Sequence, residues 1–203
     1  TIYRNYFAPV GDQIGQSAAN QLDGLADLGT ELSRALARPV SDLWSMQNGY
    51  ALATRTGLDL IAAHLRDIGG LGVSDLAGRL RMGLHQGVEV TDGPTSPGQS
   101  VNQIFCSALP VAYGRWPQPL WQEFAQLILD AAYEATLLAG VLNGRQGGSN
   151  IVLLTLLGGG AFGNAPEWIH TAIQRALDKT QGHGLDVRLV SYGPPSAEMR
   201  ALV

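Results

Sequence analysis

The residues with the clearest potential for chemistry form a glycine-rich segment in the last quarter of the chain. The stretch LTLLGGGAFGNAPEWI, residues 154–169, passes from an apolar run through four glycines in six positions to an amphipathic segment. This order predicts a loop between a buried strand and a helix, where ligands of open α/β sheets bind and free N–H groups favour phosphate. Glycines have no side chain, so an anion can approach their backbone closely. The Phe162 side chain offers an apolar surface to a ring of the ligand. The residues expected to line this site are Gly158, Gly159, Gly160, Ala161, Phe162, Gly163 and Asn164.

Two other interpretations of this segment stay open. A tight turn needs only one or two residues at positive φ, so four glycines favour ligand contact over simple chain reversal without excluding it. Gly158, Gly160 and Gly163 also satisfy the G-x-G-x-x-G pattern of dinucleotide-binding units. That unit requires an acidic residue at the far end of the next strand, whereas Asp186 stands at its beginning. A hydride-transfer enzyme is therefore disfavoured.

Hydrophobic periodicity predicts the elements that must position the glycine segment. Apolar residues at spacings of three and four predict helices over 23–37, 57–68, 119–143 and 164–181, and apolar runs predict strands over 84–91, 150–157 and 185–192. The unbroken run over 150–157 is typical of a strand covered on both faces. Asn164 followed by Glu167 indicates a helix capping box. The order of helix, strand, loop, helix and strand indicates an α/β fold with parallel neighbours.

Composition narrows the classes of function. The chain has 203 residues, 45% hydrophobic and 15% charged, which predicts a single domain over 1–203. A net charge of -4 without a run of Lys or Arg argues against a nucleic-acid surface, and no signal peptide or membrane span is visible, so we expect a cytoplasmic protein. Cys106 is the only cysteine and the four histidines are scattered, so we expect no disulfide, metal or cofactor.

Three stretches together resemble a divergent branch of the macrodomain family. They are GVEVTDGPTSPGQSVNQIFCSALPVAYG (87–114), AAYEATLLAGVLN (131–143) and LTLLGGGAFGN (154–164). Macrodomains bind ADP-ribose and often hydrolyse ADP-ribosyl bonds; this branch is similar to poly(ADP-ribose) glycohydrolases and includes bacterial effectors that remove ADP-ribose from arginine of modified ubiquitin. The resemblance covers most of the chain. It implies a three-layer α/β/α fold with a mixed, largely parallel central sheet, and it implies that residues 158–164 hold the ligand's diphosphate.

Within the resemblance, Asp92 and Glu89 are the candidate catalytic carboxylates. Hydrolysis at an anomeric carbon needs a positioned water and stabilisation of an oxocarbenium-like transition state, and a carboxylate supplies both. Asp92 is preferred because it ends a predicted strand, although Asp before Gly-Pro is equally a good turn former. Asn102 is expected to contact ribose and Tyr113 to close the pocket. A plain structural role is the alternative for Asn102 and Tyr113. Glu134 either reaches the site from its helix or lies at a solvated edge.

The chain also departs from ordinary macrodomains. It has no early glycine triplet after a strand and no acidic residue at an adenine-binding position near its start, and relatives carry a further N-terminal stretch before TIYRNYF. We therefore expect a single macrodomain-like domain that lacks part of its native N-terminal region. The expected function is binding of ADP-ribose or an ADP-ribosylated protein and metal-independent hydrolysis of the linkage, with arginine the favoured acceptor. The alternatives are a non-catalytic ADP-ribose reader and an α/β domain for another nucleotide; an effector would act inside a host cell, and the sequence does not indicate an oligomeric state.

Overall fold

The structure is a computed structural model that describes residues 9–17, 20–91, 98–191, 193–200 and 202. Short helices and strands alternate through the first third of the chain, and longer elements follow. In order they are β1 (Pro9–Val10), β2 (Gln13–Ile14), α1 (Ala26–Leu36), α2 (Val40–Leu43), β3 (Trp44–Gln47), β4 (Tyr50–Ala53), α3 (Arg55–Ala77), β5 (Gly83–Glu89), β6 (Ser100–Phe105), α4 (Gln122–Arg145), β7 (Ile151–Leu154), α5 (Pro166–Thr180), β8 (Asp186–Leu189) and α6 (Ala197–Arg200). Two 3-10 turns, Val111–Tyr113 and Gln118–Trp121, precede α4.

The four predicted helices are all present, with ends that differ by a few residues except in α3. α3 extends well past the predicted helix, and it is broken at Gly69, where φ is 63° and ψ is -177°. This backbone conformation is open to glycine and rare for other residues, so Gly69 allows the break. Thr54 caps α3, because its Oγ1 accepts a hydrogen bond of 2.8 Å from the Gly57 N–H.

The strands form pairs. β7 and β8 are parallel, with Ile151 opposite Asp186, as the sequence predicts. The other three pairs, β1 with β2, β3 with β4 and β5 with β6, are antiparallel. No strand in the described ranges joins one pair to another. The chain is thus a mixed α and β protein, but the described residues do not form the continuous, largely parallel central sheet that was expected.

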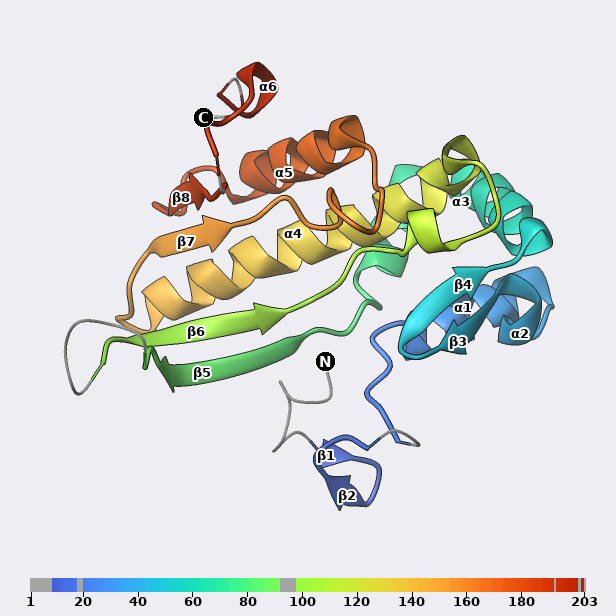
Figure 1. The fold of residues 1–203 in the computed structure, drawn as a ribbon, viewed down its shortest axis with the longest axis horizontal. Helices are drawn as coiled ribbons and strands as arrows, with labels where there is room; N and C mark the ends of the chain where they lie inside the picture. The colour runs from blue at the N-terminus through green and yellow to red at the C-terminus, as the bar shows by residue number, and fades with distance from the viewer. Residues whose placement is uncertain (1–8, 18–19, 92–97, 192, 201, 203) are drawn as a thin grey trace.

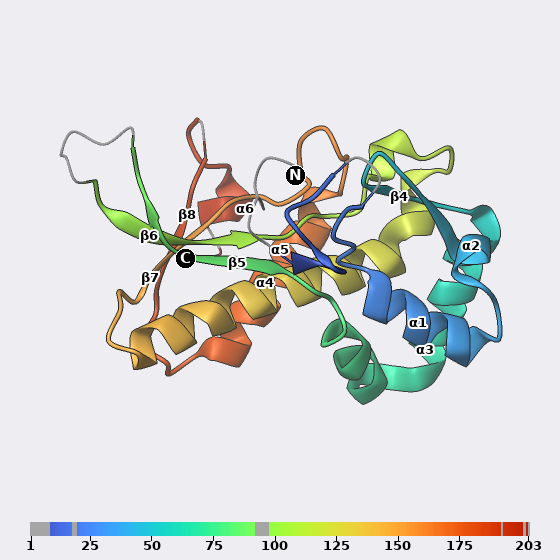
Figure 2. The same cartoon turned by 90° about the horizontal axis from the view of Figure 1, so that it is seen from below.

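The β5–β6 and β7–β8 pairs lie on one side of α4 (Figures 1 and 2). α4 runs along both pairs, and α5 packs closely beside it in the same helical layer. The centre of the core is the first half of α4, where Phe124 is fully buried and stacks on Trp44 at 5.4 Å between ring centroids. Its largest fully buried partners include Trp121, Leu28, Leu32, Leu43, Leu58, Ile61 and Leu127.

The outer face of β7 is not covered. Leu154 is buried against the helices, but Ile151 and Leu153 are 44% and 63% exposed, and Val190 just after β8 is 46% exposed. The prediction that this strand is covered on both faces was therefore wrong, because the described helices cover only one. A third layer over this face stays a prediction.

One segment, Gln118–Arg145, is long and apolar enough to cross a membrane by length and composition alone. It contains α4, which packs against α3, α5, β7 and the preceding 3-10 turn. These are the contacts of a helix at the centre of a folded core, and core helices of soluble proteins meet the same length and composition test.

Candidate functional site

The glycine segment forms the loop between β7 and α5, as predicted. Gly158 and Gly163 have φ of 76° and 67°. A Cβ at Gly158 would collide with the Ala108 side chain, and a Cβ at Gly163 would lie 2.8 Å from the Cβ of Ala112. These two glycines are therefore required by the turn and by its close approach to the chain that follows β6. They serve the fold whether or not a ligand binds.

Asn164 holds the loop together from inside. The residue is only 2% exposed, its backbone N–H donates to the Gly158 carbonyl at 3.0 Å, and its Nδ2 donates to the Leu109 carbonyl at 2.9 Å. The capping-box prediction was wrong, because α5 begins at Pro166 with Ala165 as its N-cap and no side-chain cap. The Asn164 Oδ1 is buried and has no partner among the described residues. This oxygen is an acceptor available to a donor that enters the loop.

Gly160 differs from the structural glycines. Its φ is outside the positive range, and a Cβ added there would meet no atom within 4 Å. The N–H groups of Gly160, Ala161 and Phe162 donate to no described group, and Gly160 and Ala161 are exposed. The loop thus offers three consecutive N–H donors beside the start of a helix, an arrangement that suits an anionic oxygen.

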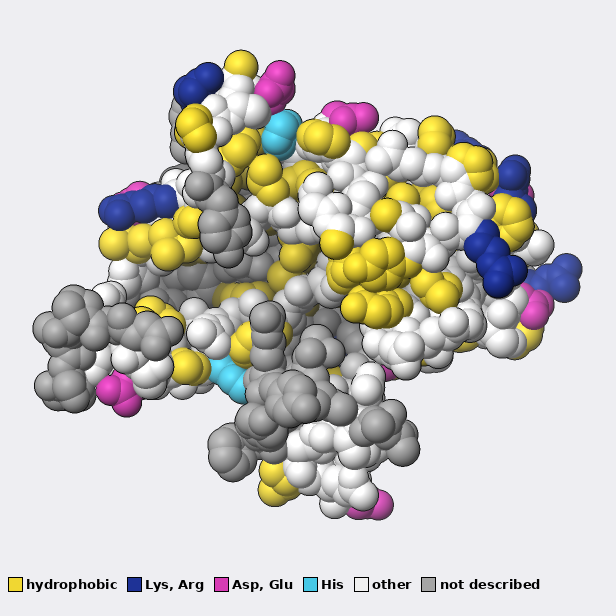
Figure 3. Space-filling view, viewed as in Figure 1, with side chains coloured by type: hydrophobic (Ala, Val, Ile, Leu, Met, Phe, Trp, Pro, Cys, Tyr) yellow, Lys and Arg dark blue, Asp and Glu magenta, His cyan; other side chains and the backbone are white. Residues whose placement is uncertain are grey.

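Three aromatic rings lie next to these donors. Phe162 meets Tyr50 at 5.7 Å and Tyr113 at 5.5 Å between ring centroids, and the two tyrosines meet at 5.2 Å, all edge to face. Tyr50 and Tyr113 remain 37% and 47% exposed, and hydrophobic side chains gather on this part of the surface (Figure 3). The rings offer a platform for a flat or apolar ligand group beside the three N–H donors.

Tyr113 was expected at the pocket, but sequence reasoning missed Tyr50. It comes from the β3–β4 hairpin, whose turn residues Asn48 and Gly49 have φ of 52° and 80°. Asn-Gly between two short β-prone runs is a strong hairpin signal, and it would have predicted a turn directly before Tyr50. Its proximity to Phe162 depends on tertiary packing.

The structure separates Glu89 from the glycine loop. Glu89 is exposed at the end of β5, where its Oε1 accepts a hydrogen bond of 2.9 Å from the Gly98 N–H. The other end of the hairpin pairs Gly83 with Phe105, and the chain after Phe105 is the part that contacts the loop (Figure 1). Glu89 and the loop thus lie toward opposite ends of the β5–β6 hairpin. Asp92 lies outside the described residues.

Asn102 lies midway along β6. Its Oδ1 accepts from the Gly87 N–H at 2.9 Å, and its Nδ2 donates to the Asn143 Oδ1 at 2.9 Å. It lines a groove of about 710 Å³ between β6 and β7, over α4. Thr155 and Leu157 line the same groove where it approaches the glycine loop. Asn102 therefore lines the groove, and its side chain already bonds β5 and α4.

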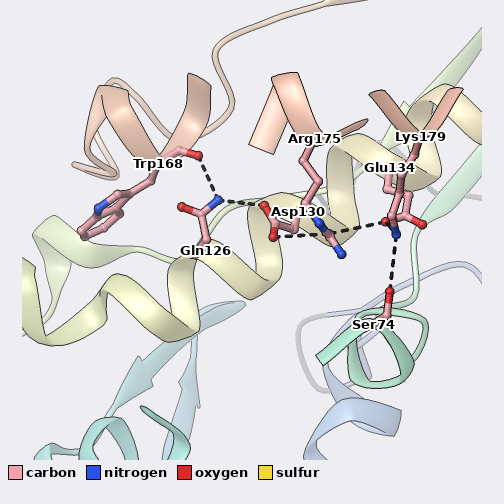
Figure 4. Close-up of polar contacts among 7 residues, drawn as sticks. All are labelled: Ser74, Gln126, Asp130, Glu134, Trp168, Arg175 and Lys179. Atoms are coloured by element: carbon pink, nitrogen blue, oxygen red, sulfur yellow. Dashed lines mark hydrogen bonds and ion pairs between the residues drawn. The ribbon is translucent and has the colours of Figure 1, made fainter. Parts of the chain in front are cut away.

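Glu134 belongs to an ion-pair network between α4 and α5 (Figure 4). Its Oε2 lies 2.6 Å from the Lys179 Nζ and 3.5 Å from an Arg175 guanidinium nitrogen, which is also 3.3 Å from the Asp130 carboxylate. Lys179 reaches Ser74 on α3 at 3.4 Å. Burial raises the pKa of Asp130, a rise opposed by the hydrogen bond from Gln126 and by the charge of Arg175. These contacts assign Glu134 a structural role between helices, away from the groove and the loop.

No group of three His, Cys, Asp or Glu residues in the described ranges is arranged to hold a metal ion. Cys106 lines the groove, and burial raises the pKa of its thiol, which suppresses the nucleophilic thiolate. Comparison of the chain with models of known protein families, with curated proteins and with solved structures gives no match. Function is therefore inferred from the geometry of the glycine loop.

Proposed function

We propose that this protein binds ADP-ribose, with the diphosphate on the Gly160–Phe162 N–H groups. The observation that carries the proposal is Gly160, which has an ordinary φ and open space where a side chain would be. Neither the turn nor the packing explains a glycine there, whereas close approach of a phosphate to the backbone does. Three consecutive donors beside the first turn of α5 supply hydrogen bonds and a favourable field for the negative charge.

The aromatic cluster of Tyr50, Tyr113 and Phe162 contributes the rest of the recognition in this proposal. A nucleotide joins a charged diphosphate to flat rings and polar sugars, and the loop joins free N–H donors to a partly exposed aromatic surface. We further propose that β5, β6, β7 and β8 belong to one layer of a macrodomain-type fold. The position of α4 beneath both strand pairs supports this arrangement.

The proposed activity is metal-independent hydrolysis of an ADP-ribosyl linkage on a modified protein. A base takes a proton from water as its oxygen bonds to the anomeric carbon, and the bond to the acceptor breaks with its electron pair leaving on the acceptor, which is protonated. Asp92 is the proposed base. The non-catalytic reader is the second candidate, and the position of Glu89 favours it, because this carboxylate accepts a backbone hydrogen bond at the far end of the hairpin.

Thermal unfolding with ADP-ribose, NAD, AMP and ATP tests the ligand. At about a hundred times its dissociation constant, ADP-ribose adds roughly 2.7 kcal/mol, or about 5 to 10 °C in Tm for a domain of this size, and NAD adds less. Gly160→Val is expected to remove the shift while the protein stays folded. Gly70→Val is the matched control, because Gly70 is exposed with open space around its Cβ position but lies on α3.

Each outcome of this experiment is decisive for one part of the proposal. A larger shift with ATP, or none with ADP-ribose, rejects ADP-ribose as the ligand. An unchanged shift in Gly160→Val removes the loop from the binding site. Equal losses in Gly160→Val and Gly70→Val point to a general effect on folding and reject a local one.

A further inference from the structure

β6 and β7 each have one edge without a strand partner in the described part of the chain. β6 pairs with β5 alone, and β7 pairs with β8 alone. Both strands line the groove of about 710 Å³ over α4, which we call the interstrand groove. Figure 3 shows the surface hollowed between them. An open strand edge presents a row of N–H and C=O groups ready to pair with another strand.

α4 fixes both sides of the interstrand groove. Asn143 near its end bonds Asn102 of β6, and Gly140 lies so close to Val152 of β7 that a Cβ there would be 2.5 Å from the Val152 Cγ2. Thr136 and Ala139 precede Gly140 and Asn143 on the same helix. They are partly exposed and line the groove. The two open edges are therefore held over a floor in which Thr136, Ala139 and Gly140 have short side chains or none.

The described lining carries no charge. Among the residues that the structure describes, none of the side chains around the interstrand groove is Asp, Glu, Lys, Arg or His. A charged side chain would lose part of its hydration there without gaining a counter-ion from the described lining, and this cost favours uncharged occupants. Backbone amides and uncharged side chains match both the open strand edges and the apolar floor.

We propose that the interstrand groove binds an extended, uncharged peptide segment of a partner protein, which pairs as a strand with β6, β7 or both. The main-chain hydrogen bonds supply affinity and the short floor residues select small or β-branched side chains on alternate positions. A segment paired on both sides would join the two strand pairs into one five-stranded sheet over α4. This inference is independent of the nucleotide proposed for the glycine loop.

A second copy of this chain fits the interstrand groove less well than a free segment. Every described strand is already half of a pair, so a second copy would have to insert a whole pair where the two open edges flank one groove. An outer edge of β5 or β8 from another copy can pair with only one side. An unpaired segment can satisfy both sides, so we assign the occupant to a partner.

Selection from a random decapeptide library displayed on phage tests the proposal. The full chain serves as bait, and the enriched sequences are expected to be uncharged and rich in β-branched residues. A synthetic version of the enriched peptide is then titrated by fluorescence anisotropy.

Ala139→Arg places a charge on the groove floor and is expected to weaken peptide binding at least tenfold. N-methylation of alternate peptide nitrogens removes main-chain donors from the peptide and is expected to weaken binding to the same extent. Leu138→Arg is the matched control, because Leu138 is the adjacent, exposed residue of α4 outside the groove.

Three results overturn the proposal. These are the absence of any enriched peptide whose binding depends on Ala139, equal weakening by Ala139→Arg and Leu138→Arg, and full affinity after N-methylation. Dimerisation that persists in Leu153→Lys and competes with the peptide assigns the groove to a second copy instead. A gain in affinity on deletion of residues 1–8 assigns it to the chain's own N-terminus. Ala139→Arg should leave the Tm shift with ADP-ribose unchanged, and Gly160→Val should leave peptide binding unchanged. The two proposals can therefore be rejected independently.

Discussion

The glycines of the β7–α5 loop divide by what each does in the folded chain. Gly158 and Gly163 adopt positive φ and lie against Ala108 and Ala112, so the turn itself needs them. Gly160 has neither constraint. In the sequence, all four glycines of the loop look equivalent, and a turn and a ligand loop are both open interpretations. The structure divides the two roles among different residues of one motif.

Substitution of the structural glycine is expected to affect stability first. Gly158→Ala places a Cβ at φ 76° and against Ala108, so we expect a loss of about 2 to 4 kcal/mol from backbone strain and overpacking. Gly160→Ala should stay within about 0.5 kcal/mol of wild type, since nothing lies within 4 Å of its Cβ position. Urea unfolding of both variants measures the difference. Equal effects at the two positions would contradict this division of roles.

Asp92 is expected to separate the hydrolase from the reader. Asp92→Asn keeps the size of the side chain but removes its capacity to take a proton, so release of ADP-ribose from an arginine-modified protein should slow by roughly 10²- to 10⁴-fold. Affinity for free ADP-ribose should change little. Mass spectrometry of the modified substrate, without added metal, gives the rate.

Glu89→Gln is the control for Asp92→Asn. Gln retains an acceptor for the Gly98 N–H, so this variant should keep wild-type activity. Full activity in Asp92→Asn combined with an inactive Glu89→Gln would transfer the role of base to Glu89. If a chain that binds ADP-ribose turns over no arginine, glutamate, serine or polymer substrate, the protein is a reader.

At the scale of elements, the α4–α5 contact contains the most consequential buried charge. Asp130 is 9% exposed, and burial raises its pKa in the folded state despite Gln126 and Arg175. The folded chain therefore holds this proton more tightly than the unfolded chain does. Between the ordinary Asp pKa and the raised folded value, the free energy of unfolding falls as pH increases.

Asp130→Asn tests this pH dependence. The variant cannot titrate at this position, yet its amide oxygen still accepts from Gln126, which donates to Asp130 at 2.7 Å in the wild type. The free energy of unfolding of the wild type minus that of the variant is expected to decrease as pH rises above the ordinary Asp pKa, measured by urea unfolding at each pH. A difference that is constant or grows with pH would show that the ion pair with Arg175 outweighs burial.

The sequence predicted the positions of the long helices and strands well, but it predicted poorly which of them pack or pair in the folded chain. Periodicity located α4, α5, β7 and β8 because each has a long apolar stripe or run. β6 was not predicted as a strand, because SVNQIF alternates weakly and follows a segment rich in Gly and Pro. The distance between Glu89 and the glycine loop depends on the direction of the β5–β6 hairpin, which no local pattern specifies. The loop was recognisable from its own residues, but its aromatic neighbours were not.

At the scale of the whole molecule, the strand layer has one face covered by helices and one face with exposed apolar side chains. Ile151 and Leu153 of β7 and Val190, just after β8, are each at least 44% exposed, and the ion-paired Asp186 and Arg188 lie opposite Ile151 and Leu153. Large apolar side chains exposed on a strand promote association with other chains. We expect the isolated chain to self-associate in a concentration-dependent manner.

Leu153→Lys should reduce this association without loss of stability, as measured by light scattering over a range of protein concentrations. Leu71→Lys is the matched control, because Leu71 is 87% exposed but lies on α3 away from the strands. An equal reduction by both variants would mean that net charge, and not the strand face, governs association.

The break at Gly69 has a consequence for how the chain is cut by proteases. Cleavage requires a segment that can extend into a protease active site, and intact helices resist this. Gly69 interrupts the helical hydrogen bonds at an exposed position, and Leu71, two residues later, offers the large apolar side chain that thermolysin selects. Limited digestion of the native protein should therefore nick α3 beside Leu71 among its earliest sites. The two fragments should remain together under native conditions, because Leu58, Ile61 and Leu65 on one side of the nick are buried in the same core as α4.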